Sequence, residues 1–406
     1  MNSYANDHSL ISHIKEKCLR KENINELADK DLSMLINHYC NEVLIDFGAQ
    51  TNIEDLMELS RQVFFSIRGL GALENLILDD EINEIMVNDL DHIFIERKGV
   101  MQRSEIKIHD MAEYNRIIQK IVSDAGREVN LSNPIVDCRL ADGSRVNIIL
   151  PPIALKYPVV TIRKFPSFHI NMDFLVTNHT IDDPTCKFLS DIVKAKYNIL
   201  IGGGTSSGKT SFLNALSGFI SPDERVVTIE DSRELQLNNI ENLISLETRN
   251  ANTSNRGRIE IKDLIKNALR MRPDRIIVGE VRSDETIDML QAMNTGHEGS
   301  ITTAHANGTN DMISRLETLV LRSKEQIPIE AVRRMIGSSL EIIIQLARLG
   351  PDKRRVVEIS EIYLEDDKIM INKLYEYDMK EDRLFRNGNP MRNKKKLEDY
   401  ESFKKF

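Results

Sequence analysis

The stretch that most constrains the fold is rich in glycine and lies between an apolar run and a helical pattern. The run Tyr197–Ile201 precedes it, the glycines fall within Gly203–Thr210, and the helical pattern begins at Ser211. A strand, a tight glycine turn and a helix in this order form one unit of an α/β sheet. In this spacing backbone N–H groups surround phosphate oxygens, Lys209 reaches the terminal phosphates, and the Thr210 hydroxyl ligates Mg²⁺. The sequence therefore predicts a loop that binds a nucleoside triphosphate, with the positive end of the helix facing the phosphates.

The alternative interpretation is a loop of glycine and serine that binds nothing. It requires four fixed positions to coincide by chance between a strand and a helix, which disfavours it. We expect the nucleotide to contact Gly203, Gly204, Thr205, Ser206, Ser207, Gly208, Lys209, Thr210 and Ser211.

Composition indicates a globular chain with more than one domain. At 406 residues, length alone favours two or three domains, and 41% apolar and 29% charged residues are close to average usage. No apolar run approaches the roughly 18 residues that span a bilayer, and Met1–His8 lacks the features of a signal peptide. We therefore expect a cytoplasmic protein. The net charge of -9 argues against direct nucleic-acid binding, and the scattered cysteines predict neither disulfides nor a zinc site.

Periodicity divides the chain into segments. Apolar residues recur at helical spacing from about residue 9 to 66, which predicts a small helical bundle. An α+β domain is predicted by a helix over 111–125 and by strand-like runs at 82–87, 92–96, 145–150 and 159–163. The expected organisation is a helical bundle over 1–68, an α+β domain over 69–165, a connector over 166–183, a nucleotide-binding domain over 184–388 and a charged, solvated tail over 389–406.

The C-terminal part alternates strand and helix patterns. This alternation predicts a largely parallel sheet covered by helices, with ligands at the carboxyl ends of the strands, so the fold class is α/β. Expected helices lie at 261–270, 284–293 and 312–321. Expected strands lie at 198–201, 226–229, 243–246, 275–278, 300–303 and 341–347, with an antiparallel pair at 356–364 and 369–376.

Two carboxylates follow expected strands and are candidates for the chemistry at the loop. Glu230 follows Val226–Ile229, and Glu280 follows Arg275–Gly279. A carboxylate beside a phosphate loop can hold Mg²⁺, directly or through water, or polarise the attacking water. Because glutamate stands at 280 where aspartate is usual, we expect Glu280 to contact Mg²⁺ through water, alongside Thr210. The alternative for either residue is an exposed acid at a strand end.

Histidines and arginines supply the remaining candidates. His297 and His305 fall within one short segment, where imidazole can hydrogen-bond a γ-phosphate, and a structural role is the alternative. The permanently charged fork of arginine suits neutralisation of a γ-phosphate, and surface salt bridges are its alternative. The arginine candidates of the α+β domain are Arg139, Arg145 and Arg163, and further candidates are Arg256, Arg258, Arg270, Arg272 and Arg282.

With these segments in order, the chain resembles the superfamily of type II and type IV secretion ATPases. The matching segments are Gly203–Thr210 for its phosphate loop, Thr228–Leu235 for its aspartate box, Ile276–Glu280 for its atypical Walker B strand and Thr295–Asn307 for its histidine box. Within that superfamily, four segments resemble the tight-adherence (Tad/Flp) pilus assembly ATPases: Gly69–Leu73, Glu84–Asn88, Asp142–Asn147 and Thr161–Phe165. The four-cysteine zinc insertion of many other members is missing from the sequence, which favours the same branch.

The resemblance implies a subunit of two lobes in a homo-hexameric ring. A PAS-like N-terminal domain and a RecA-like P-loop domain would sandwich ATP, with Mg²⁺, at their junction, and hydrolysis would move them about a hinge at 166–183. The implied partners are platform proteins of the inner membrane and, indirectly, pilin subunits, at the cytoplasmic face of that membrane and with no direct nucleic-acid partner.

The resemblance also assigns roles. Glu230 becomes the candidate for activating water and Glu280 the candidate for supporting Mg²⁺. The pair His297 and His305 would sense the γ-phosphate. The candidate phosphate or inter-subunit fingers are Arg139, Arg145 and Arg163.

The leading hypothesis is therefore an ATP-hydrolysing motor that powers pilus assembly or protein secretion. One alternative is the traffic ATPase of a type IV secretion or conjugation system. Another is a scaffold that binds nucleotide and switches without hydrolysing it.

Overall fold

The computed structural model describes residues 8–21, 24–47, 52–97, 99–165, 170–249, 257–323, 327–350 and 353–403. The chain forms two compact units, Met1–Ser167 (unit 1) and Phe168–Phe406 (unit 2). Among the predicted features, Arg256, the first residues of the connector and the end of the tail lie outside the described residues. In the described ranges, no helix is both long and apolar enough to cross a membrane.

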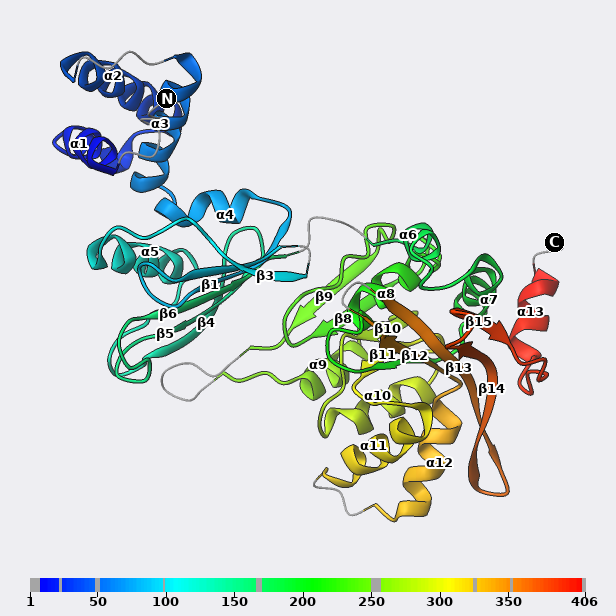
Figure 1. Cartoon of the computed structure of the whole chain (residues 1–406). Helices are drawn as coiled ribbons and strands as arrows, with labels where there is room; N and C mark the ends of the chain where they lie inside the picture. Colours follow the sequence, from blue (N-terminus) through cyan, green and yellow to red (C-terminus); the bar gives the residue numbers. More distant parts are fainter. Residues whose placement is uncertain are drawn as a thin grey trace. The chain divides into compact units, whose positions relative to one another are not determined.

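Unit 1 begins with helices that lie together at the N-terminal end of the described chain (Figure 1), and their buried apolar residues share one core. They are α1 (His8–Leu19), α2 (Asp29–Asp46) and α3 (Ile53–Ile67), with a 3-10 turn at Ile24–Glu26. Ile14, Ile36 and Val63 are buried in their shared core. At the start of α3 the Asn52 side chain accepts a hydrogen bond of 2.7 Å from Asp55 N, which caps the helix. The helical pattern predicted over about 9–66 is thus present.

The rest of unit 1 is an α+β layer. Its described elements are the 3-10 turn Gly71–Leu73, α4 (Glu74–Leu78), β1 (Ile82–Val87), β2 (Ile93–Arg97), β3 (Val100–Arg103), α5 (Met111–Asp124), β4 (Ile135–Arg139), β5 (Arg145–Ile149) and β6 (Val159–Arg163). The strands form one sheet in the order β3-β2-β1-β6-β5-β4. Helix α5 covers it, burying Tyr114, Ile117 and Ile121 against the sheet residues Ile85 and Ile162.

Unit 2 is built around a mixed sheet whose central strands are parallel. The described strands are β7 (Ile199–Gly203), β8 (Val226–Glu230), β9 (Leu243–Glu247), β10 (Arg275–Val278), β11 (Ile301–Ala304), β12 (Ile342–Arg348), β13 (Arg354–Glu365), β14 (Lys368–Asp378) and β15 (Arg383–Arg386). Their order is β15-β14-β13-β12-β7-β11-β10-β8-β9, and the run from β12 to β9 is parallel. The strands predicted from the alternating pattern are confirmed. The glycine-rich loop follows β7, in the middle of the sheet.

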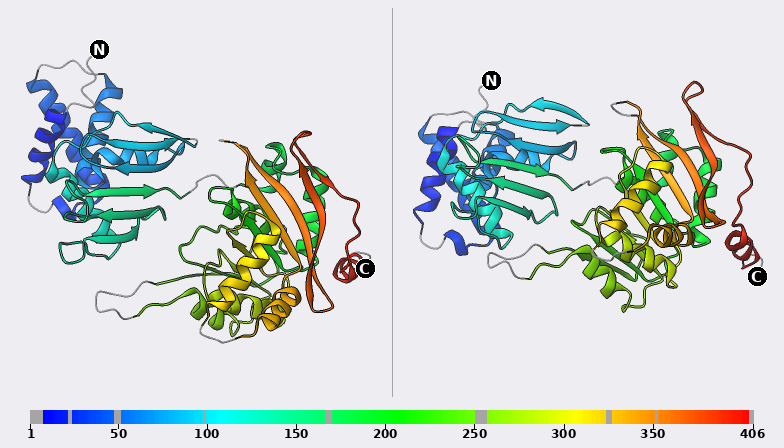
Figure 2. Two further views of the ribbon diagram at one scale, coloured as in Figure 1. Left: turned by 60° about the horizontal axis from the view of Figure 1, so that its bottom comes forward. Right: turned by 90° about the horizontal axis from the view of Figure 1, so that it is seen from below.

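Helices cover both faces of this sheet, as Figures 1 and 2 show from three directions. They are α6 (Met172–Thr177), α7 (Asp183–Lys194), α8 (Lys209–Ser217), α9 (Ile261–Ala268), α10 (Glu285–Asn294), α11 (Thr309–Leu321), α12 (Ile329–Ser339) and α13 (Lys395–Phe403). Helices α6 to α8 share one apolar core with Ile199 and Ile342. Helices α9 to α12 share the opposite core with Leu200 and Val278. Strands β7, β8, β10 and β11 are buried along their whole length, so their sequences are mostly apolar and do not alternate.

The connector expected over 166–183 is largely part of unit 2. From residue 170 onward it contains α6, and Met172, Leu175 and Ile181 are buried in the core beside α7. Any hinge between the units is therefore shorter than the sequence pattern indicated.

The described part of the C-terminal segment is largely exposed, but a few contacts attach it to unit 2. Met391 is buried, and the Glu361 carboxylate on β13 accepts hydrogen bonds from the backbone N–H groups of Arg392 and Asn393, at 2.6 to 3.1 Å. Lys396 Nζ donates to Glu341 at 2.8 Å. The segment is thus attached by one carboxylate that accepts backbone hydrogen bonds and by one ion pair, between Lys396 and Glu341.

We expect the Glu361 carboxylate to hold this segment. Glu361 is 1% exposed. Glu361→Gln places an amide against two backbone donors, so the free energy of unfolding of unit 2 should fall by about 1–3 kcal/mol. Limited proteolysis should cut near residue 390 sooner, with a lower thermal midpoint. Glu365→Gln, an exposed glutamate at the end of the same strand, is the matched control. Equal resistance of both variants would contradict this role.

Candidate functional site

The glycine-rich loop lies at the carboxyl end of β7 and leads into α8. Gly203 has φ 157° and Gly208 has φ 92°, conformations that favour glycine. A Cβ on Gly203 would also collide with Ser207 Oγ and with the Leu346 carbonyl. Ser206 adopts φ 58°, so the loop holds a serine in the left-handed region as well. The turn is therefore shaped by its glycines as the sequence predicts.

Lys209 is folded back onto its own loop. Its side chain is 7% exposed, and Nζ donates to the carbonyls of Gly203 (3.1 Å) and Gly204 (3.0 Å). It also lies 3.1 Å from Nδ1 of His305. Thr210 occupies the first turn of α8 and is partly buried.

A chain of alternating charges continues from Lys209 along the carboxyl edge of the sheet. His305 follows β11, and its Nε2 lies 3.1 Å from Oε1 of Glu280, which follows β10. Oε2 of Glu280 accepts a hydrogen bond of 2.7 Å from Arg282, whose Nη1 lies 3.7 Å from Asp231. The structure thus brings Lys209, His305 and Glu280 together, as the order of the motifs predicts.

Glu230 ends β8 on the same edge and is 4% exposed. Its Oε1 accepts hydrogen bonds from the backbone N–H groups of Glu234 (2.8 Å) and Leu235 (3.1 Å). Its Cγ packs against Gly279, where an added Cβ would stand 2.9 Å away. Glu230 is therefore a fixed carboxylate beside the residue that precedes Glu280.

Burial lowers the pKa of both Lys209 and His305. It lowers the pKa of Lys209, which the Glu280 carboxylate opposes. Burial also lowers the pKa of His305 below its ordinary value of 6.5, an effect that Glu280 opposes and Lys209 reinforces. The contacts then fit a neutral imidazole that accepts at Nδ1 from Lys209, with Nε2 lying 3.1 Å from Glu280 Oε1 but outside hydrogen-bond geometry. The hydrogen bond to Glu280 raises the pKa of Arg282.

Among the described residues, two of the buried polar atoms without a hydrogen-bond partner lie at this edge, Ser207 Oγ and Glu280 Oε1, and others lie elsewhere in the chain. An unpaired buried polar atom costs about 1–3 kcal/mol, and such atoms mark places that a ligand can complete. The oxygens of Thr210 and Glu280 are of the kind that Mg²⁺ takes beside phosphates. The residues present therefore fit a nucleotide with Mg²⁺.

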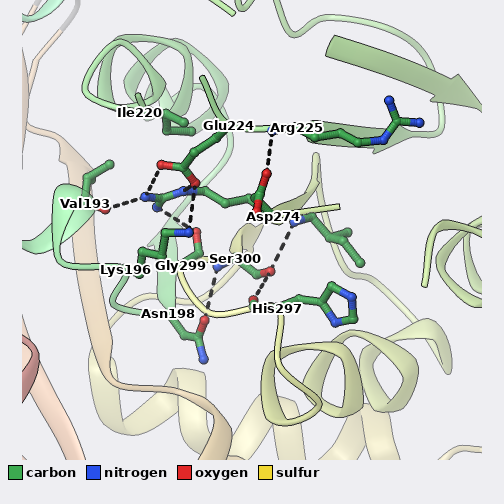
Figure 3. Close-up of polar contacts among 12 residues, drawn as sticks. Val193, Lys196, Asn198, Ile220, Glu224, Arg225, Asp274, His297, Gly299 and Ser300 are labelled. Atoms are coloured by element: carbon green, nitrogen blue, oxygen red, sulfur yellow. Dashed lines mark hydrogen bonds and ion pairs between the residues drawn. The ribbon is translucent and has the colours of Figure 1, made fainter. Parts of the chain in front are cut away.

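His297 lies apart from this group. It precedes β11, at the amino ends of the strands, whereas the loop follows the carboxyl end of the neighbouring strand β7. Figure 3 shows His297 beside Asn198 and Ser300; its carbonyl accepts a hydrogen bond of 2.7 Å from Ser300 Oγ. The structure does not bring His297 to Lys209, so within one subunit the expectation that both histidines meet the γ-phosphate is not met.

The amino edge is instead organised by Arg275, which is 0% exposed. Its guanidinium forms two hydrogen bonds to Glu224, at 2.7 and 3.0 Å, and donates to the carbonyls of Val193 (2.7 Å) and Gly299 (3.1 Å) (Figure 3). A Cβ on Gly299 would touch this guanidinium. Gly299, within the segment Thr295–Asn307, therefore packs against the buried ion pair of Arg275 and Glu224.

The arginine candidates of unit 1 form a row across three strands. Arg139 pairs with Arg145 between β4 and β5, and Arg145 pairs with Arg163 between β5 and β6. Like charges directly opposite each other are unfavourable in a sheet, so the row concentrates positive charge at one end of it. Arg163 is exposed.

Sequence reasoning missed Arg354 and singled out Arg282 only as one of several arginines. Arg354 begins β13 and donates from Nε to the Ser206 carbonyl at 3.2 Å, next to the strained turn. The signal for Arg282 is its position two residues after Glu280. Arg354 has no comparable signal, because its contact depends on the pairing of β12 with β13.

A parallel α/β sheet with a glycine loop, a helix N-terminus and acidic side chains at its carboxyl edge defines a class of nucleotide-binding α/β proteins. Residues 67–386 match the family of type II/IV secretion system proteins. The chain belongs to this family.

Similar proteins come from secretion and conjugation systems. The conjugal transfer protein TrbB of Rhizobium radiobacter is 34% identical over 300 residues, covering 72% of this chain and 88% of that protein. The type IV secretion system protein PtlH of Bordetella pertussis is 30% identical over 316 residues, covering 71% and 93%. The crystal structure of the pilus retraction motor PilT with bound ADP covers 82% of this chain and 87% of its own, with a TM-score of 0.52 and 18% identity. This last likeness shows the fold.

The lowered pKa of His305 predicts a pH dependence of stability. Because the folded state binds this proton less readily than the unfolded state, the contribution of the neutral ring is present above pH 6.5 and is lost as the pH falls. His305→Asn should therefore lose less stability than the wild type between about pH 7.5 and 5. Thermal midpoints across this range measure the difference, with the exposed His109→Asn as control. Parallel profiles of His305→Asn and wild type would contradict the assignment.

Proposed function

We propose that this chain is an ATP-hydrolysing motor of a secretion or pilus assembly machine. The observation that carries the proposal is the meeting of Lys209, His305 and Glu280 beside the glycine-rich loop. Family membership supports the setting, because the relatives named above belong to conjugal transfer and type IV secretion systems.

The proposed chemistry divides among the residues at the carboxyl edge. Lys209 exchanges the carbonyls of Gly203 and Gly204 for phosphate oxygens, which are stronger, charged acceptors. Thr210 and Glu280 would hold Mg²⁺, Glu280 through water, and the ion neutralises phosphate charge when bound. Glu230, fixed by two backbone N–H groups, orients the attacking water. His305 contacts both Lys209 and Glu280, so it is placed to respond to the γ-phosphate.

We further propose that the arginine row of unit 1, Arg139, Arg145 and Arg163, supplies positive charge to the triphosphate in an assembled homo-hexamer. In this proposal residues 69–165 are a PAS-like lobe, residues 184–388 are the RecA-like lobe, and the hinge lies between these two lobes. Three guanidinium groups at one end of a sheet favour an anion as their ligand. His297, by contrast, we assign to packing of the amino edge.

Within the family, we propose the tight-adherence pilus branch, with inner-membrane platform proteins as partners at the cytoplasmic face. The second candidate is a conjugation or type IV secretion ATPase, favoured by the likeness to TrbB and PtlH. The partner decides between them: a purified protein that binds a pilus platform protein supports the first, and one that binds conjugation components supports the second.

Hydrolysis can be tested with two site variants. Glu230→Gln should keep ATP affinity within about threefold and lower kcat about 10²- to 10⁴-fold, because water activation is lost while the loop is intact. Lys209→Ala should lose binding as well. Phosphate release and equilibrium binding of a fluorescent ATP analogue measure the two effects.

The control is Glu241→Gln, an exposed glutamate outside the site, which should behave as wild type. Wild-type protein that binds ATP tightly but releases no phosphate, with or without platform protein, would favour the scaffold over the motor. Undiminished hydrolysis by Lys209→Ala would refute the site.

If the arginine row of one subunit acts on the nucleotide of its neighbour, two inactive variants should restore activity when they are mixed. Lys209→Ala and Arg145→Ala should each be inactive, for different reasons. When they are mixed and reassembled in equal amounts, about a quarter of the sites should pair an intact loop with an intact arginine from a neighbour, and activity should return to that extent. If the arginines act within their own subunit, mixing restores nothing.

A further inference from the structure

Gln345 is the polar side chain within the buried stretch Ile342–Leu346 of β12, in the core of unit 2. It lies on β12, which runs parallel to β7, and it is 2% exposed. Its Nε2 donates a hydrogen bond of 2.6 Å to the carbonyl of Ala306, the residue directly after His305. A buried strand of this kind is normally filled with aliphatic residues, so the glutamine needs an explanation.

The same side chain contacts the strand that carries the phosphate loop. Gln345 pairs in register with Gly202, one residue before the loop. A Cβ on Gly202 would collide with Gln345 Oε1. Gln345 therefore fills the space that the absent side chain of Gly202 leaves, and it spans from β7 to the segment after His305.

A second side chain holds the other end of that segment. Glu358 lies on β13 directly opposite Gln345, and its Oε1 accepts hydrogen bonds from Thr309 Oγ1 (2.5 Å) and Ser360 Oγ (2.6 Å). The turn from Ala306 to Thr309 is thus fixed at both ends by neighbouring residues of two adjacent strands. His305 stands immediately before this turn.

We propose that Gln345 is a positioning residue that sets the place of His305 against Lys209 and Glu280. The inference rests on the proposed function, and it adds a residue that acts through another rather than on the nucleotide. Gln345 fixes the Ala306 carbonyl relative to Gly202, and so it fixes the distance between the histidine and the loop. A polar residue is required because the Ala306 carbonyl needs a donor inside an apolar layer.

The test combines kinetics with a double-mutant cycle. Gln345→Met keeps the size of the side chain and removes the donor. It should lower kcat about ten- to hundredfold with KM for ATP changed less than about threefold, since the loop is intact and the histidine is displaced. In a His305→Ala background the same change should cause no further loss, because both residues act as one unit. Thr185→Val, at a buried polar residue of α7 outside the site, is the matched control and should keep wild-type kinetics.

A second measurement does not depend on turnover. Amide hydrogen exchange in the nucleotide-free protein should quicken in the peptide that covers 305–312 in Gln345→Met and stay unchanged in Thr185→Val. If exchange quickens equally in β10, the effect is general destabilisation and the proposal fails. Additive losses in the His305→Ala background, or unchanged exchange over 305–312, would also overturn it. If wild type releases no phosphate, the motor proposal fails, while the exchange result still decides whether Gln345 holds the turn.

Discussion

The parallel pairing of β7 with β11 and β12 is the constraint on which the site depends. Gly202 stands in register with Ala304 on one side and Gln345 on the other, so three strands are aligned at the base of the loop. A side chain at Gly202 or Gly203 would meet atoms of the neighbouring strand β12. With this alignment the residue after Ala304 emerges beside the loop, and that residue is His305. The contact between Lys209 and His305 therefore follows from strand register rather than from any attraction between the two side chains.

Residues at strand ends could be predicted from the sequence, because parallel strands share one carboxyl edge. The glycine spacing located the loop, and the apolar runs before Glu230 and Glu280 placed both acids on that edge. Contacts that depend on cross-strand pairing could not be predicted. From the sequence, Gln345 is only one residue of a predicted strand. Its neighbours become known from its pairing with Gly202 in the sheet. The attachment of the C-terminal segment was missed for the same reason, since Glu361 lies far from Arg392 in the chain.

The two histidines show how sequence proximity misleads. Only eight positions separate His297 from His305, and both fall in one motif. The strand β11 lies between them, however, and a strand of four residues advances the chain by about 13 Å. The two rings are thus carried to opposite edges of the sheet. A motif that spans a strand serves both edges, and here one end packs around Arg275 while the other reaches Lys209.

Strand β10 carries an arginine–glutamate pair at each of its ends, and burial makes the two pairs different. Arg275 and Glu224 lie 2.7 Å apart with the arginine side chain fully buried, whereas Arg282 and Glu280 lie 2.7 Å apart with the Arg282 side chain 59% exposed. Breaking a buried pair leaves an uncompensated charge and lowers the free energy of unfolding by about 3–5 kcal/mol. The pair of Arg275 and Glu224 is therefore a permanent structural contact. The Arg282 pair is exposed on its arginine side only, with Glu280 17% exposed, so solvent screens it more than the Arg275 pair and Glu280 can exchange Arg282 for another partner at lower cost. The same chemistry at equal distance thus fixes the amino end of the strand and leaves its carboxyl end free to respond to a ligand.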